Sequence, residues 1–210
     1  MCKNFLCFFL TLMITLSLSA CSDSLSDRDM DIYEKIHKHY NKMESFSADL
    51  DLTVFSNKTK NRYFVSQKYQ SPDKFFTRVT DDDATFSVTT ITNKDKTKTY
   101  ADGSEYSLTI PSEEYVSFLF LNNFFKAYYL SLETSLSVDS SLTKTDKTIL
   151  SVELSENEYC IETISLSIDN KTLSPHTLTA YGTDKNELFV AKYDNFKFNE
   201  KLDDSIFNTD

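Results

Sequence analysis

The sequence predicts an α+β domain in which one antiparallel sheet carries helices. Its apolar residues first recur at steps of three and four, then alternate along the chain, and the alternation is broken once by an aromatic segment. The alternating stretches follow one another about every ten residues with turn-like sequences between them, as in a meander of antiparallel strands. Gly103 and Gly182 are the only glycines, which excludes glycine-rich nucleotide loops.

Residues 1–20 are expected to be a lipoprotein signal peptide. Lys3 is followed by an almost uncharged run of secretory length that is too short to span a bilayer comfortably. The run ends in Leu18-Ser19-Ala20-Cys21, a lipobox in which the Cys21 thiol takes a diacylglyceryl group; the alternative is an ordinary signal peptide with an incidental cysteine. Two acyl chains anchor a protein stably, so we expect attachment on the extracytoplasmic face of a membrane.

Residues 21–29 read as a flexible tether, and residues 30–210 as one domain. The formal net charge is −10, and loss of Lys3 with the signal peptide makes it more negative. A phosphate backbone would repel such a body, so nucleic acid is not an expected partner. Membrane attachment is therefore expected to come from the lipid on Cys21.

An amphipathic helix is predicted from Asp29, since Tyr33, Ile36 and Tyr40 recur at helical spacing while Lys35 and Lys38 take another face. Apolar residues then alternate with polar ones, beginning with Ala48, Leu50 and Leu52 against Asp49 and Asp51. The strands expected in this half are 47–55, 61–69, 74–80, 85–92, 97–101 and 105–110.

The aromatic segment 111–133 is predicted to be a helix lying across the sheet. Pro111 ends the preceding strand, Ser112 can cap the helix, and Glu113 and Glu114 suit the positive end of its dipole. Its apolar residues extend almost all round, so it is either plain core or a groove and partner contact. The candidate contact residues are Phe118, Leu121, Phe124, Phe125, Tyr128 and Tyr129. Strands are expected again at 147–155, 159–169, 176–182, 188–194 and 196–198.

No residue pattern predicts catalysis. His37 and His39 point roughly 200° apart on a helix and cannot converge on one metal, and His176 has no ligand-type neighbour in the sequence. No serine lies in a nucleophile elbow. We expect no catalytic residue, no metal and no cofactor.

The C-terminal sequence SLSIDNKTLSPHTLTAYGTDKNELFVAKYDNFKFNEKLDDSIF resembles the closing part of the LolA/RseB-type lipoprotein superfamily. YQSPDKFFTRV, residues 69–79, resembles the strand of that superfamily that opens at a proline. The resemblance covers about residues 30–208. It implies a strongly curved antiparallel sheet, an unclosed half-barrel, with helices packed on its concave face.

Within the superfamily the chain most resembles the GerS-type germination lipoproteins, through its lipobox, YNKMESFSADLDLTVFSNK and NRYFVSQKYQSPDKF. That resemblance implies a non-catalytic protein, in the forespore envelope of a sporulating cell, that binds and activates a cell-wall amidase of the CwlD type for the spore cortex. The alternative is a carrier for lipids or lipoproteins in the half-barrel groove; a hydrolase is a third possibility. Open sheet edges also favour a homodimer.

Overall fold

A computed structural model describes residues 27–56, 59–103, 117, 119–131, 134–139, 146–154 and 161–209. Two compact units are separated between Asp31 and Ile32. The described part of the first unit is the beginning of helix α2 (Asp27–Tyr40), and the second unit contains the sheet. Cys21, the predicted signal peptide and the strand predicted at 105–110 lie outside the described residues.

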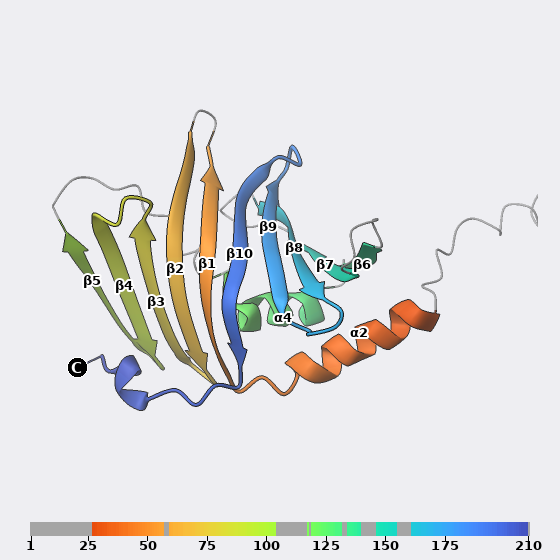
Figure 1. The fold of residues 1–210 in the computed structure, drawn as a ribbon, viewed down its shortest axis with the longest axis horizontal. Helices are drawn as coiled ribbons and strands as arrows, with labels where there is room; N and C mark the ends of the chain where they lie inside the picture. Colours follow the sequence, from red (N-terminus) through yellow and green to blue (C-terminus); the bar gives the residue numbers. More distant parts are fainter. Residues whose placement is uncertain are drawn as a thin grey trace, which may run out of the picture. The chain divides into compact units, whose positions relative to one another are not determined.

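In the described part of the chain, ten strands form one antiparallel sheet with the order β5-β4-β3-β2-β1-β10-β9-β8-β7-β6 (Figure 1). Nearly all neighbours in the sheet are also neighbours in sequence, and the exception is the central pair of β1 and β10. The strands are β1 (Ser45–Phe55), β2 (Lys60–Gln70), β3 (Lys74–Asp81), β4 (Phe86–Asn93), β5 (Lys96–Gly103), β6 (Thr134–Asp139), β7 (Lys147–Glu153), β8 (Ile161–Asp169), β9 (Pro175–Gly182) and β10 (Glu187–Phe198). Among the described residues the sheet is unclosed, as the resemblance to LolA/RseB-type proteins implied, and β5 and β6 lie at its edges.

Alternation along β1 gives the sheet a core face and an open face. Phe46, Leu50 and Leu52 are buried on the core face, whereas Asp49 is exposed and Asp51 half-buried on the open face. The same alternation runs through β2, where Tyr63, Val65, Gln67 and Tyr69 are buried and their neighbours are more accessible. A one-residue slip in register would exchange the two faces, so the hydrophobic pattern fixes the pairing.

Helix α4 (Leu121–Leu130) and the second half of α2 pack on the core face. The ring of Phe120 contacts Phe46 of β1 and Phe75 of β3, and the hydroxyl of Tyr193 in β10 donates to the carbonyl of Leu119. Helix α4 also contacts β7. Residues 120–130 therefore reach strands that lie far apart in the sheet, because the sheet curves around them. The predicted α+β half-barrel with helices on one face is confirmed.

Tyr40 joins the two helices to the sheet. Its ring stacks on Phe125 of α4 with 4.2 Å between the centroids, and its hydroxyl donates to the carbonyl of Leu173 at 2.8 Å. Burial raises the pKa of the Tyr40 hydroxyl well above its ordinary value. No helix in the described ranges is both long and apolar enough to cross a membrane.

The structure corrects the predicted elements in four places, of which the first is the helix predicted at 111–133: α4 covers only Leu121–Leu130, because residues 119 and 120 form a turn before it. α2 begins at Asp27 rather than Asp29, and β6 forms at 134–139, where no strand was predicted. The strands predicted at 188–194 and 196–198 are a single strand, β10. It carries a bulge at Asn195, whose φ of 49° lies in the left-handed region that asparagine tolerates. The predicted cap at Ser112 lies outside the described residues.

The chain leaves β10 and crosses the end of the open face as a strap, residues 199–207, which ends in the short helix η2 (Asp204–Phe207) (Figure 1). Phe207 is fully buried at the end of the strap, and η2 contacts β3 and β4. Asp203 caps η2 by accepting from the backbone N–H of Ser205 at 2.9 Å.

Candidate functional site

Most of the predicted contact residues of the aromatic helix lie in the core. Leu121, Phe124, Phe125 and Tyr128 are buried, and Phe118 lies outside the described residues. Tyr129 is 37% exposed, and Leu130 beside it is 74% exposed. Burial raises the pKa of Tyr128 to about 12 and that of Tyr129 still further. Only the C-terminal end of α4 therefore presents aromatic and aliphatic surface to solvent.

The histidines are separated, as their spacing predicted. The ring of His37 meets Tyr129 edge-on at 4.8 Å, whereas His39 stacks on Phe198 at 4.0 Å on the other flank of α2. His176 lies 3.1 Å from the ammonium of Lys147. Within the ranges that the structure describes, no cluster of three or more histidine, cysteine or acidic side chains is arranged to hold a metal ion.

The open face carries a hollow over the middle of β10, β1, β2 and β3. Its wall residues are Asp49, Asp51, Arg62, Phe64, Ser66, Arg78, Thr80, Asp194 and Asn195, with backbone from Leu50 and Val65. Phe64 is 43% exposed there, and the Arg62 guanidinium lies 5.1 Å from its ring centroid. Arg78 donates to the hydroxyl of Ser87 at 3.1 Å. Arginines, carboxylates and an exposed aromatic ring thus line one hollow.

Asp49 and Asp194 stand directly opposite each other on β1 and β10. Like charges at such positions disfavour pairing of the strands. The side-chain amide of Asn195 donates to one Asp49 oxygen at 2.9 Å, so the bulge on β10 supplies a compensating donor. This acidic side of the hollow exists only because the last strand pairs with the first.

Arg62 and Asp51 form a two-pronged ion pair across β2 and β1. Nε and Nη2 of Arg62 donate to the two carboxylate oxygens at 2.8 and 2.6 Å, and Asp82 lies 3.7 Å away on the other side. The hydrogen bonds from Arg62 hold the pKa of Asp51 below its ordinary value, against the opposing effect of its partial burial. The pair fixes the arginine at the rim of the hollow.

Replacing Asp51 with asparagine should lower the free energy of unfolding by less than about 1 kcal/mol, because the pair is partly solvated. A lowered pKa in the folded state stabilises the protein above the unfolded value of 3.8, and the effect disappears as the pH falls through the folded value. Urea unfolding of both proteins at neutral and strongly acidic pH measures this difference. A difference that persists in acid would contradict the ion-pair account.

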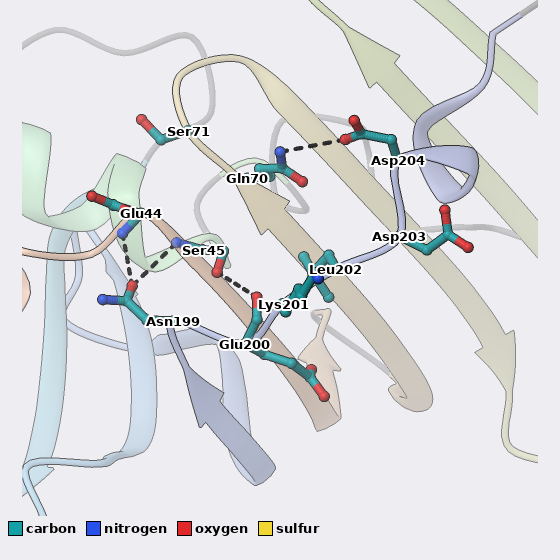
Figure 2. Close-up of a pocket in the computed structure, with 10 residues that line it drawn as sticks. All are labelled: Glu44, Ser45, Gln70, Ser71, Asn199, Glu200, Lys201, Leu202, Asp203 and Asp204. Carbon is teal, nitrogen blue, oxygen red and sulfur yellow. Dashed lines mark hydrogen bonds between the residues drawn. The ribbon is translucent and has the colours of Figure 1, made fainter.

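The strap encloses a second, polar hollow at the end of β1 and β2. Figure 2 shows Asn199 facing the backbone of Glu44 and Ser45 on one side and Asp204 meeting Gln70 on the other. The side-chain oxygen of Asn199 accepts from the backbone N–H groups of Glu44 and Ser45 at 2.8 and 3.3 Å. The side-chain amide nitrogen of Asn199 donates to the backbone carbonyl of Lys42 at 2.9 Å. One side chain thus joins the strap to the chain entering β1.

Further contacts hold the strap along its length. The hydroxyl of Ser45 donates to the carbonyl of Glu200 at 2.6 Å, and the hydroxyl of Ser47 donates to the Glu200 carboxylate. The Lys74 ammonium lies 2.7 Å from Asp204 and 5.8 Å from the ring centroid of Phe207. Acidic and amide side chains form much of the lining of the hollow beneath, and those of Asn199, Glu200 and Asp204 already bond to neighbouring side chains or to the backbone.

The sequence predicted some of this site. It placed Asp49 and Asp51 on the polar side of their strand, and the resemblance to LolA/RseB proteins included Asn199, Leu202-Asp203-Asp204 and Phe207. Arg62, Phe64 and Arg78 were not singled out as binding residues, and the alternation within β2 and β3 places them on the open face. Their position beside Asp194 depends on strand order and had no local signal.

In the described residues, an unclosed antiparallel sheet curved around a helix defines an α+β half-barrel. The profile of the family described as sporulation protein YdcC-like matches residues 2–207, so the chain belongs to this family. No curated protein sequence matches the chain.

Solved structures with a related fold include LolA superfamily proteins. A LolA superfamily protein from Nitrosomonas europaea has 11% identity and a TM-score of 0.40, with 86% of this chain and 97% of that chain covered. A DUF1329 family protein from Desulfovibrio piger has 9% identity and a TM-score of 0.47, with 86% and 96% covered. One chain of a solved complex between the CwlD amidase and the GerS lipoprotein from Clostridioides difficile has 15% identity and a TM-score of 0.35, with 85% of this chain and 98% of that chain covered.

Proposed function

We propose that the protein is a non-catalytic, lipid-anchored interaction protein of the forespore envelope that binds and activates a CwlD-type N-acetylmuramoyl-L-alanine amidase. Membership of a sporulation family supports the setting. The lipobox at Cys21 supports attachment to the extracytoplasmic face of a membrane. The GerS-like sequence from Tyr40 onward supports an amidase as the partner.

The amidase is proposed to bind the open face, and the observation that carries this is the hollow around Phe64. Aromatic and arginine side chains dominate the binding energy of protein interfaces. Phe64 is exposed with Arg62 held over its ring, and Arg78 lies across the same hollow. Since Asp51 fixes Arg62 in the free protein, little side-chain entropy is lost on binding.

The experiment is a titration of the purified amidase with the detergent-solubilised protein, with amidase activity and affinity as readouts. Wild type should raise the activity, and Phe64→Ala or Arg62→Glu should raise Kd at least about tenfold. Lys126→Glu, an exposed change on the other side of the sheet, is the matched control and should leave Kd unchanged. An amidase indifferent to the wild type would end the proposal, and a larger effect of Lys126→Glu would move the interface to α4.

The second candidate is a carrier of lipids or lipoproteins, with Leu121, Phe124, Phe125 and Tyr128 lining a groove for acyl chains. Gln67 is the observation in its favour, because its side chain is fully buried on the core face without a hydrogen-bond partner among the described residues. A polar group of a ligand would satisfy that amide. Native mass spectrometry of the purified protein tests this: co-purified lipid supports the carrier, and an empty protein contradicts it.

Self-association through sheet edges is proposed as well. Among the described residues β5 and β6 are the edge strands of the sheet, and an edge strand is where a second copy of a chain can add by backbone pairing. Light scattering across a concentration series should show a dimer, and a strict monomer would contradict it.

A further inference from the structure

One side of α4 presents an exposed stripe made of Lys126, Tyr129 and Leu130. These residues are three and four apart, so they share one face of the helix. Leu130 is 74% exposed, the highest value among the large hydrophobic side chains that the structure describes. The half-buried Asn123, three residues before Lys126, continues the stripe toward the start of the helix.

The stripe continues onto α2 through aromatic contacts. The ring of Tyr129 meets His37 at 4.8 Å, and His37 stacks on Tyr33 at 6.1 Å. An exposed leucine beside tyrosines and a long lysine is the combination that favours a membrane interface. The leucine enters the acyl boundary, the tyrosine lies at the headgroups, and the lysine extends its ammonium to lipid phosphates.

The predicted anchor lies within reach of this stripe. Cys21 and the start of α2 at Asp27 are six residues apart, which is at most about 20 Å of extended chain. Tyr33 follows another six residues along the helix, a rise of about 9 Å. The chain from Cys21 to Tyr33 is therefore at most about 30 Å long, so a bilayer that holds acyl chains on Cys21 stays within this length of Tyr33.

We infer that the Lys126, Tyr129 and Leu130 stripe rests on the bilayer interface of the membrane that holds the lipid anchor. This inference rests on the acylation of Cys21 proposed above. Because α4 packs on the core face, membrane contact through its exposed side leaves Phe64 and Arg62 on the opposite side of the sheet. The lipid surface and the proposed amidase then use different sides of one sheet.

The chain contains no tryptophan, so a single introduced tryptophan reports one position by fluorescence. Leu130→Trp places the reporter in the stripe. Tyr100→Trp is the matched control, because Tyr100 is 48% exposed but lies on β5, on the open face. Both acylated proteins are reconstituted on vesicles of phosphatidylcholine and phosphatidylglycerol with brominated acyl chains, which quench tryptophan in the hydrocarbon boundary.

The tryptophan at 130 should shift to the blue and lose emission severalfold on brominated vesicles, while that at 100 stays unchanged. Adding Lys126→Glu to Leu130→Trp should reduce the quenching.

Co-sedimentation separates the possible failures. A protein that sediments with vesicles while neither tryptophan is quenched keeps its anchor and overturns the inference. A protein that does not sediment overturns both the anchor and the inference. A blue shift of the tryptophan at 130 that needs the amidase and no lipid makes the stripe a protein contact and also overturns it.

Discussion

Replacing Phe207 with alanine should lower the free energy of unfolding by about 3–5 kcal/mol, the usual cost of emptying a fully buried phenylalanine site. Phe207 is completely buried although it lies outside the main core, and it anchors the end of the strap. Its carbonyl accepts from the side-chain amide of Asn93 at 3.1 Å, so loss of the ring also loosens that bond. Urea unfolding followed by circular dichroism measures the change.

Two variants control this result. Phe207→Leu keeps most of the buried area and should cost clearly less, whereas Ser205→Ala changes an exposed side chain of the same short helix and should cost almost nothing. In Phe207→Ala, limited proteolysis should also cut the strap faster than in the wild type. A loss below about 1 kcal/mol would show that the polar contacts of Asn199 and Glu200 hold the strap without its apolar anchor.

Replacing Gln67 with leucine should raise the free energy of unfolding by about 1–3 kcal/mol. The described residues offer its buried amide no hydrogen-bond partner, so the native state carries a desolvation cost that an apolar side chain of similar size removes. Ala48 on β1 and the buried Thr77 on β3 lie opposite Gln67. Apart from the Thr77 hydroxyl, these neighbours are apolar. Urea unfolding of ligand-free protein measures the gain.

Thr77→Val is the matched control, because it removes a neighbouring hydroxyl of similar burial and leaves the Gln67 side chain in place. If Gln67→Leu instead destabilises the protein, its amide has a partner in solution. If the wild type carries lipid and Gln67→Leu loses it while keeping its fold, the result would favour the carrier hypothesis over the interaction hypothesis.

Most of the strands, and the face that their residues take, could be predicted from alternation. The buried Phe46, Leu50 and Leu52 and the outward Asp49 and Asp51 follow from spacing, because one face of the sheet is covered and the other is not. β6 escaped prediction for a physical reason. It is a six-residue edge strand in which only Leu136 and Val138 are apolar, so its apolar signal is weak.

The hollow around Phe64 could not be predicted, because it depends on which strand lies beside β1. Asp194 and Asn195 come from β10, more than 140 residues after Asp49, and local periodicity carries no information on such pairing. The strap was missed for another reason. Among its apolar residues only Phe207 is fully buried, and its position is fixed by side-chain to backbone contacts such as those of Asn199.

The central pairing of β1 with β10 has a consequence for biosynthesis. Phe46 lies opposite Phe198, so the middle of the sheet joins residues from near the start and near the end of the chain. A growing polypeptide holds β1 with one side unpaired until almost all residues have been made, and contacts of such long sequence separation form slowly. We propose that residues 1–20 direct the chain to export. This delay then keeps the polypeptide unfolded during translocation, and β1 pairs with β10 only on the far side of the membrane.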